Sequence, residues 1–322
     1  MKKLLKVAVV AVAALIALVL LAYAGLWIAR AITYRTYLAD KEVVCKIPAL
    51  NDGFVAQGIS YVDGDGGYLH SGYWGEEISV SYVKDKETRI FKPLDETGAI
   101  AKGHGGGITA HGDFVYVADD NSLLVYSLSA LLAAKDGDSL ACVTRIPVDN
   151  QASFCFAQNG RMFVGEFYRP EVYETDKAHA YTTPENEANR AIVSCYTILE
   201  DGTLEEIPDY WISLPAQVQG FAMDENGVIA ISRSWGVSSS LIEFYNGMLE
   251  TGITAHYANK EVPIYYIGSA NLMQSIKAPA FSEDLDIVDG RIVISYESAC
   301  NKYIVGKLFF AYHAESYPIP AK

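Results

Sequence analysis

The sequence predicts an all-β fold, a β-propeller of five blades, because one short pattern recurs five times along the chain. The pattern is a strand, a tight turn, and a second strand that ends in aromatic or charged residues. Its clearest copy runs from Ala56 to Trp74, and the others lie in residues 104–120, 151–168, 219–235 and 284–297. A hairpin that returns roughly every 45–65 residues is typical of propeller blades, each of which is one small sheet.

The composition agrees with this fold class and excludes one class of partner. Half of the 322 residues are hydrophobic (51%) and 22 are tyrosine, which suits pleated, half-buried surfaces. The net charge is −14, although the first 35 residues carry five basic side chains and no acidic one. The remainder is therefore strongly acidic, which predicts no nucleic-acid binding and no docking through charge onto anionic lipids.

A long apolar segment at the N-terminus predicts a membrane anchor. Residues 7–29 contain no charged side chain, and a helix of that length spans a hydrocarbon core of about 30 Å. Lys2, Lys3 and Lys6 precede it, so the positive-inside rule places the N-terminus in the cytoplasm of a single-pass cell-membrane protein. The predicted parts are a basic cytoplasmic stub (1–6), a transmembrane signal anchor (7–29), a linker (30–40) and an extracytoplasmic propeller domain (41–322).

A cleaved signal peptide, giving a secreted form, is the alternative to the anchor. Ala22-Tyr-Ala24 fits an A-x-A cleavage site after an apolar run. The run continues through residues 25–29, which is longer than a usual signal core and favours the uncleaved anchor. The lysine-rich start and the lack of an N-x-[ST] sequon fit a bacterial protein.

Alternating apolar residues predict the strands of the first four blades. Blade one has 58–62, 68–73, 78–83 and 88–93, and blade two has 108–110, 114–118, 123–128 and 141–147, with a helix at 129–135 capped by Ser129. Blade three has the hairpin 151–168, a polar insertion that ends at Asn189, and strands at 191–199 and 204–214. Blade four has 220–223, 228–232, 240–245 and 262–267, followed by a helical turn or loop at 271–276.

Blade five has three strands, at 285–288, 292–296 and 303–313, whereas a spare strand at 41–49 precedes blade one. Ring closure would make this early strand the outer strand of blade five and so remove an exposed sheet edge. Blades three and four are long enough to hide a sixth unit, but they show no sixth copy of the hairpin. A β-sandwich would not explain the repeat.

Two positions of the repeat should converge on one face of the propeller, because the inner strands line a central channel. The first position, at the entry to the inner strand, holds Gln57, His104, Gln151, Gln219 and Glu283. The second position, after the second strand, holds Tyr73, Trp74, Glu76, Asp119, Asp120, Glu166, Phe167, Tyr168, Arg169, Arg233, Trp235, Tyr296 and Glu297. Such a rim of amides, acids and aromatics predicts a funnel for a small polar ligand.

The candidate ligand-binding residues are taken from these two positions: Gln57, Trp74, His104, Glu166, Gln219, Arg233, Trp235, Glu283 and Glu297. His104 and Glu166 are also the candidate catalytic residues, His104 as a general base or metal ligand. The surrounding glycines at 103–107 precede a strand rather than a helix, so they do not form a phosphate loop. Structural roles remain open for all of them, including an arginine–carboxylate pair between blades.

The sequence establishes no cofactor. Ca²⁺ is the ion that carboxylate and amide oxygens of the rim would suit, but no calcium-loop pattern, zinc spacing or G-x-S-x-G motif is present. The five cysteines include Cys142 and Cys155 in neighbouring predicted strands, where either a disulfide or two plain thiols would fit.

Over residues 41–322 the repeated hairpin resembles the broad class of secreted bacterial β-propellers of the strictosidine synthase, gluconolactonase and YncE-like kinds. That class includes lactone hydrolases with an axial Ca²⁺ and pure binding proteins, typically with six or seven blades. Their metal ligands match no residue of this sequence position by position, so the resemblance implies no catalytic residue here.

Two functions therefore remain open. The preferred one is a membrane-anchored extracytoplasmic module that binds a small polar ligand or a cell-envelope component at the funnel. The alternative is a metal-dependent hydrolase or lyase of esters or lactones, which would use His104 with Glu166 or Glu297 in the same funnel.

Overall fold

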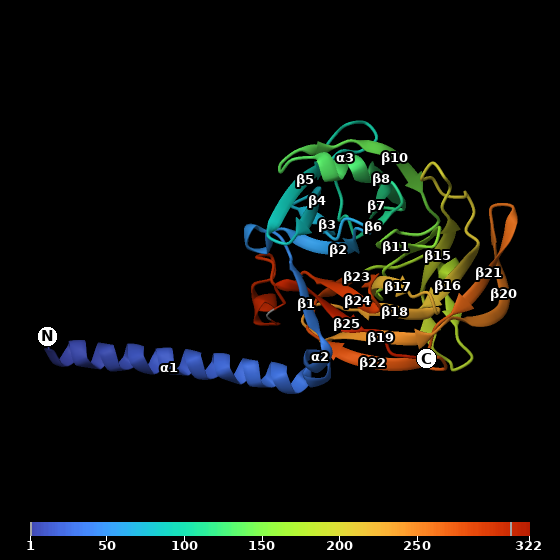
Figure 1. Cartoon of the computed structure of the whole chain (residues 1–322). Coiled ribbons are helices and arrows are strands. Elements are labelled where there is room, and N and C mark those ends of the chain that lie inside the picture. The colour runs from blue at the N-terminus through green and yellow to red at the C-terminus, as the bar shows by residue number, and fades with distance from the viewer. Residues whose placement is uncertain (1, 310) are drawn as a thin grey trace.

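The computed structural model describes residues 2–309 and 311–322 and shows a ring of five sheets with one long helix projecting from it (Figure 1). Met1, in the predicted cytoplasmic stub, and Phe310, in the predicted last strand, lie outside the described residues. Each of the five sheets starts with an inner strand, and its first four strands are antiparallel neighbours. The predicted five-bladed β-propeller is confirmed.

The blades are built from the following elements. Blade one contains β2 (Val55–Tyr61), β3 (Tyr68–Trp74), β4 (Glu77–Lys84) and β5 (Glu87–Pro93), with β9 (Ser139–Leu140) added at its edge. Blade two contains β6 (Gly107–His111), β7 (Phe114–Asp119), β8 (Ser122–Ser127) and β10 (Cys142–Pro147), and helix α3 (Leu128–Ala133) follows β8. Blade three contains β11 (Phe154–Gln158), β12 (Arg161–Gly165), β15 (Ala191–Thr197) and β16 (Tyr210–Leu214), extended by β21 (Lys260–Tyr266) and β20 (Leu249–Tyr257). Blade four contains β17 (Val218–Met223), β18 (Val228–Arg233), β19 (Ser240–Asn246) and β22 (Leu272–Ala278).

Blade five joins the two ends of the propeller. It contains β23 (Ser282–Val288), β24 (Arg291–Tyr296), β25 (His313–Pro318) and, outermost, β1 (Glu42–Lys46). β1 runs antiparallel to β25, with Glu42 opposite Ser316 and Lys46 opposite His313. Lys41 adds an ion pair to the buried Glu315. The predicted closure of the ring by the early strand is therefore confirmed.

Blade four differs from the prediction in its outer strand. Residues 262–267 were expected there, but β21 instead pairs in parallel with β16 of blade three. The outer strand is β22, in the stretch predicted as a turn or loop, where Ile276 and Ala278 face the core and Lys277 faces solvent. A period-two pattern that short was too weak to recognise. The β20–β21 hairpin is held on blade three by the packing of Val262 on Trp211.

Three smaller predictions also need correction. The segment 303–313 is not a strand: it contains the short 3₁₀ helix η3 (Ile304–Phe309), and the strand follows as β25. β25 was missed because its buried residues include polar Glu315 and Ser316. In blade three, the strand predicted over 204–214 begins only at β16. The cap of α3 is Ser127, whose Oγ accepts from Ala130 N at 3.3 Å, and not Ser129.

The inner strands approach one another so closely that glycine is required at three of them, at Gly58, Gly107 and Gly220. A Cβ on Gly107 would lie 2.5 Å from the backbone nitrogen of Cys155 in the next blade. A Cβ on Gly220 would lie 2.6 Å from the Cα of Asp284. Both contacts are with backbone, which cannot rotate away, so these glycines set how tightly the five blades can close.

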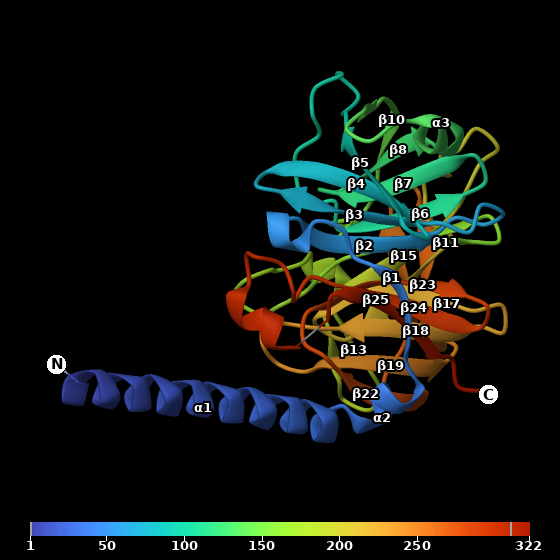
Figure 2. The ribbon, with the colours of Figure 1, turned by 60° about the vertical axis from the view of Figure 1, so that its left-hand side comes forward.

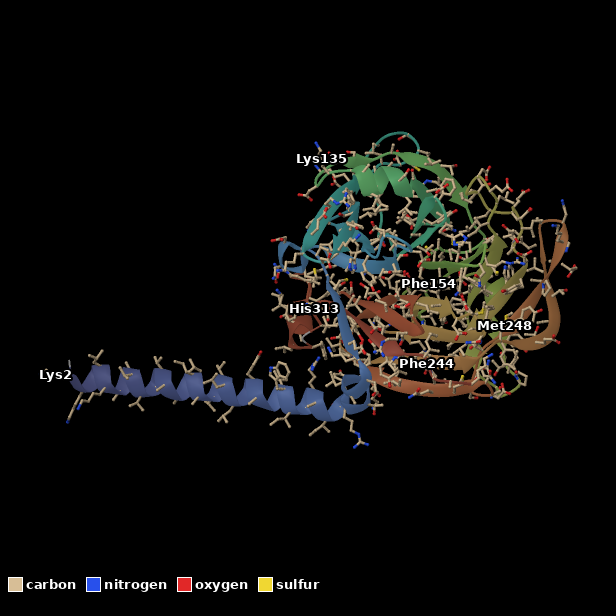
Figure 3. All side chains as sticks on the ribbon, viewed as in Figure 1. Lys2, Lys135, Phe154, Phe244, Met248 and His313 are labelled. Atoms are coloured by element: carbon tan, nitrogen blue, oxygen red, sulfur yellow. The ribbon has the colours of Figure 1, made fainter. Side chains whose placement is uncertain are left out.

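Aliphatic and aromatic side chains fill the spaces between blades. Phe154 and Phe244 are buried within the propeller, whereas most of the described side chains of α1 are exposed (Figure 3). All five cysteines are free thiols, so the thiol alternative holds for Cys142 and Cys155.

Two helices precede the propeller. α1 (Lys2–Thr33) projects away from the propeller except at its C-terminal end, and α2 (Arg35–Asp40) packs against the propeller beside β22 and β25 (Figure 2). Tyr37 of α2 is fully buried, stacks on Tyr317 at 5.6 Å between ring centroids, and accepts a hydrogen bond from the Tyr296 hydroxyl at 2.7 Å. The point at which α1 leaves the domain is therefore fixed by buried contacts.

Candidate functional site

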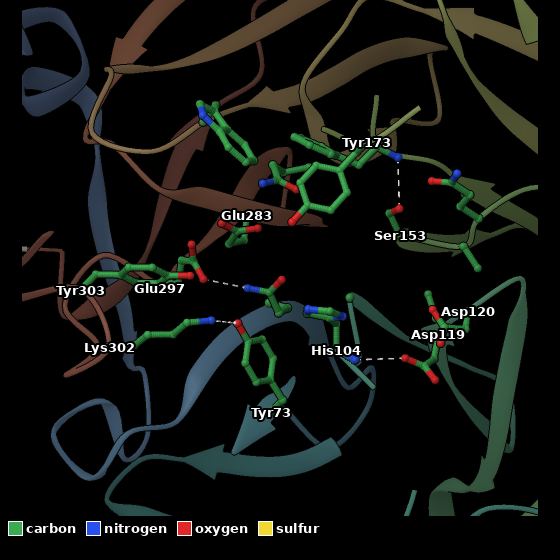
Figure 4. Close-up of a pocket in the computed structure, with 18 residues that line it drawn as sticks. Tyr73, His104, Asp119, Asp120, Ser153, Tyr173, Glu283, Glu297, Lys302 and Tyr303 are labelled. Atoms are coloured by element: carbon green, nitrogen blue, oxygen red, sulfur yellow. Dashed lines mark hydrogen bonds between the residues drawn. The ribbon is translucent and has the colours of Figure 1, made fainter. Parts of the chain in front are cut away.

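One residue from each inner strand or its entry lines a pocket of about 280 Å³ at one end of the central channel. These five equivalent positions are Gln57, Gly106, Ser153, Gln219 and Glu283. They meet because the five inner strands surround one axis, so a repeated sequence position becomes a ring in space. Residues from the loops that follow the second strands complete the wall (Figure 4).

Two buried carboxyl groups form one side of the pocket. The side chains of Glu283 and Glu297 hydrogen-bond to each other, and Gln57 Nε2 donates to Glu297 Oε2 at 3.0 Å. A hydrogen bond between two carboxyl groups needs one proton, which the two glutamates share. Burial, followed by the charge of Glu297, raises the pKa of Glu283 well above its ordinary value. Burial also raises the pKa of Glu297, to about 7.

A lysine and two tyrosines adjoin this carboxyl pair. Lys302 Nζ donates to the Tyr73 hydroxyl at 2.5 Å and lies 4.8 Å from the centre of its ring. Tyr303 hydrogen-bonds to Glu297 through its side chain, and Lys302 lowers the pKa of Glu297 by its charge. Burial acts to lower the pKa of Lys302, but Tyr73 and Glu297 outweigh it, so the net shift is upward. Lys302 therefore remains an ammonium ion near the carboxyl pair.

Three aromatic rings form another part of the wall. Phe167 stacks on Trp235 at 5.9 Å between centroids, and Tyr173 meets both rings edge to face. The guanidinium of Arg169 lies 3.8 Å from the centre of the Trp235 ring. The ring of Tyr173 points toward Glu283 in Figure 4, so the aromatic wall and the carboxyl pair face the same space.

His104 and Asp119 lie on the side away from the carboxyl pair. Asp119 Oδ1 accepts the backbone N–H of His104 at 3.1 Å, and a Cβ on Gly103 would overlap that carboxylate. Burial, followed by the charge of Asp120, raises the pKa of Asp119 to about 6. The exposed imidazole of His104 contacts the Tyr73 ring edge to face at 5.0 Å. The glycine-rich segment thus places His104 in the pocket.

The structure brings six of the nine candidate ligand-binding residues to this pocket: Gln57, His104, Gln219, Trp235, Glu283 and Glu297. The other three do not line it. Trp74 packs on Phe54 and donates to the Asp52 carbonyl at 3.1 Å. Arg233 pairs with Glu243 at 3.1 Å within its own blade, rather than between blades.

Glu166, the second candidate catalytic residue, is buried beside the pocket and paired with another histidine. Its Oε1 contacts Nδ1 of His179 at 2.7 Å and accepts the N–H of Ile192 at 3.2 Å. Burial raises the pKa of Glu166, and Glu166 raises the pKa of His179 against the effect of burial. His179 lies in η2 (Lys177–His179), within the insertion that also holds β13 (Tyr181–Thr182) and β14 (Ala188–Asn189). The structure therefore separates Glu166 from His104.

Sequence reasoning missed Tyr173, Lys302 and Tyr303. Tyr173 lies in the polar insertion of blade three, which has no counterpart in the other repeats. Lys302 and Tyr303 lie in the segment that the prediction divided between a loop and a strand. The cluster Asn301-Lys-Tyr303 directly after a blade-five acid was the available signal, because the equivalent loop of every blade reaches the same rim.

The carboxylate and amide oxygens that suggested an axial Ca²⁺ have partners within the protein. Within residues 2–309 and 311–322, no three His, Cys, Asp or Glu side chains are grouped so as to hold a metal ion. Gln57 turns its amide N–H, not its oxygen, toward Glu297. The two glutamates are already engaged by a shared proton and by donors of the protein.

Comparisons with known proteins identify no family. No protein-family model and no curated protein matches the sequence. A luciferin-regenerating enzyme is 11% identical and aligns over 86% of this chain and 95% of its own, with a TM-score of 0.43. A putative glucose dehydrogenase from Thermus thermophilus is 12% identical over 86% and 98% of the two chains, with a TM-score of 0.44.

A third similar structure is the PQQ-bound aldose sugar dehydrogenase of Streptomyces coelicolor, 16% identical over 79% of this chain and 76% of its own, with a TM-score of 0.43. The class of this protein is therefore defined by its sheet topology, which is that of a generic β-propeller with an apolar N-terminal helix.

Proposed function

We propose that this protein is a membrane-anchored, extracytoplasmic β-propeller that binds a small polar ligand with a protonated amine in its central funnel. The observation that carries the proposal is the buried Glu283–Glu297 pair, which faces the aromatic wall of Phe167, Tyr173 and Trp235 across one pocket. Carboxylates and aromatic faces both attract an organic cation. A neutral polyol would gain only ordinary hydrogen bonds from the same groups.

The carboxyl pair also gives a physical reason for amine selectivity. Its single shared proton compensates one of two buried charges, and an incoming ammonium group would compensate the second when Glu297 ionises. Because the pKa of Glu297 is about 7, amine affinity should rise between pH 5 and 8. A neutral ligand gives no such dependence.

The proposed anchoring rests on α1. Its apolar stretch Leu5–Thr33 contains an 18-residue window with a mean hydropathy of 2.9 that is fully exposed, which in water would be unfavourable. With Lys2, Lys3 and Lys6 on the cytoplasmic side, the propeller lies outside the cell.

Calorimetric titration of the full chain in detergent tests the ligand proposal. The probe is phenethylamine, and 2-phenylethanol is its neutral match. We expect the amine to bind at least tenfold more tightly at pH 8, and Glu297→Gln to remove the difference. Glu225→Gln, an exposed acid that lines a second pocket, is the matched control. Equal affinity for amine and alcohol in the unsubstituted chain would overturn the proposal.

A second candidate function is hydrolysis or elimination on a small ester or lactone. One observation favours it: the pKa of Glu297 lies near neutrality, where a general acid or base works best. This version assigns the proton transfer to Glu297 itself. A pH–rate profile on lactones and esters with an inflection near pH 7, lost in Glu297→Gln, would establish it.

A further inference from the structure

The apolar surface beside the exit of α1 is the most unusual part of the exterior of the propeller. Three aliphatic side chains of η3 are exposed: Ile304 at 78%, Val305 at 60% and Leu308 at 41%. Val237, in the loop between β18 and β19, is exposed at 61%. We call these four residues the apolar edge.

The apolar edge lies at the base of α1. Arg30 Nε, one turn before the end of α1, donates to the backbone carbonyl of Phe309 in η3 at 3.1 Å. The hydroxyls of Tyr34 and Ser239 lie 3.2 Å apart, which joins the loop of Val237 to the α1–α2 junction. In Figures 1 and 2, α1 projects from the propeller on the side where the red turn of η3 lies.

Hydrogen bonds and aromatic packing hold η3 against the propeller, so that its aliphatic side chains face outward. Lys307 Nζ donates to Asn51 Oδ1 at 2.9 Å, and the N–H of Asn301 donates to the Leu50 carbonyl at 2.9 Å in the neighbouring helix η1 (Leu50–Asp52). Phe309 and Tyr303 pack on Phe281. η3 is therefore a supported turn that presents aliphatic side chains to solvent, rather than a loop without fixed contacts.

We infer that the apolar edge docks into the surface of the lipid bilayer that α1 crosses, so that the funnel opens next to the membrane. This inference rests on the proposed anchoring by α1. The bilayer is the occupant that the structure indicates, because the edge continues the apolar surface of α1 across the Arg30 contact. Burying aliphatic side chains in the membrane interface is favourable in proportion to the apolar area that is removed from water.

Residues that line the funnel are close in sequence to residues of the apolar edge. Lys302 and Tyr303 line the pocket and immediately precede η3, and Trp235 lines it two residues before Val237. The rim of the pocket therefore ends in the residues that reach the bilayer. A ligand would enter the funnel along the membrane surface.

Depth-dependent fluorescence quenching tests the inference on the full chain in phosphatidylcholine nanodiscs. A nitrobenzoxadiazole probe is attached to Ile304→Cys and, as a control in the β17–β18 turn, to Glu225→Cys. Labelling of the unsubstituted chain corrects for the native thiols. We expect lipid-borne nitroxide to quench the probe at position 304 several-fold more than the probe at 225, and aqueous iodide to show the reverse. Adding Val305→Asp and Leu308→Asp should remove the lipid quenching.

Two outcomes separate this inference from the proposed function. If both probes are quenched alike by iodide and neither by lipid, the docking inference fails, whereas phenethylamine titrated into the same nanodiscs still tests the funnel. If position 304 is quenched by lipid but the amine shows no preference over 2-phenylethanol, the docking stands and the ligand proposal fails.

Discussion

Glu283 and Glu297 hydrogen-bond to each other inside the funnel, although they come from the first strand of blade five and from the loop after its second strand. Two carboxyl groups in contact cannot both ionise without a cation between them. The pair therefore keeps one bound proton in the folded protein. The properties of the pair, of the aromatic wall that faces it and of the ring that brings it together can each be tested.

The first prediction concerns pH. A carboxyl group with a raised pKa stabilises the folded chain at low pH, and this contribution is lost as the pH rises toward the folded-state pKa. For Glu297, a shift from 4.5 to about 7 corresponds to at most about 3 kcal/mol. The thermal midpoint in detergent should therefore fall between pH 5 and 8, and fall by several degrees less in Glu297→Gln.

Glu225→Gln, which lies outside the pocket of the pair, should keep the full pH dependence. Asp119 and Asp286, each with a pKa raised to about 6, contribute equally in all three proteins. Identical slopes in the unsubstituted chain and Glu297→Gln would contradict the assignment of a shared proton.

The second prediction concerns two tryptophans, Trp74 and Trp235, which the sequence analysis placed at equivalent positions around the funnel. Trp235 lines the pocket, whereas Trp74 packs on Phe54 outside it. Trp235→Leu should raise the dissociation constant for phenethylamine about tenfold, because a desolvated cation–π contact is worth about 1–2 kcal/mol. Trp74→Leu should change it less than twofold. Calorimetry on both variants decides, and equal losses would place the ligand elsewhere.

The third prediction concerns the closure of the ring. In Gly220→Ala the new Cβ meets the backbone of Asp284 at 2.6 Å, so blades four and five must separate. We expect a loss of about 3 kcal/mol in the free energy of unfolding, at the upper end for overpacked sites. Gly112→Ala, with a positive φ of 57° but open space, should lose about 1–2 kcal/mol from strain alone. A Gly220→Ala chain no less stable than this control would contradict the close approach.

The sequence predicted most of the architecture because the inner hairpin is a local pattern. Its alternation and its turn residues are set by neighbours within about twenty positions, so all five copies could be recognised. The closing strand was predicted by counting strands. The exchange between blades three and four was not, because the parallel pairing of β21 with β16 joins strands that are not neighbours in the chain and that belong to no repeat.

Sequence analysis recognised those residues of the candidate site that occupy equivalent positions in the repeated hairpin. Gln57, Gln219 and Glu283 occupy equivalent positions and meet at the axis for that reason alone. Tyr173 and Lys302 come from loops unique to one blade, so no periodicity marks them. Glu166 looked like a rim residue, but the insertion of blade three supplies His179 and buries it.

The sequence by itself determined the number of blades, the apolar helix and the ring of polar positions around the channel, since each depends on local periodicity or composition. The tertiary structure alone decided which of those polar groups face one another. It paired Glu283 with Glu297, turned Trp74 and Arg233 away, and set η3 beside α1. Such contacts join residues far apart in the chain, and their energies depend on distances and burial that no local pattern encodes.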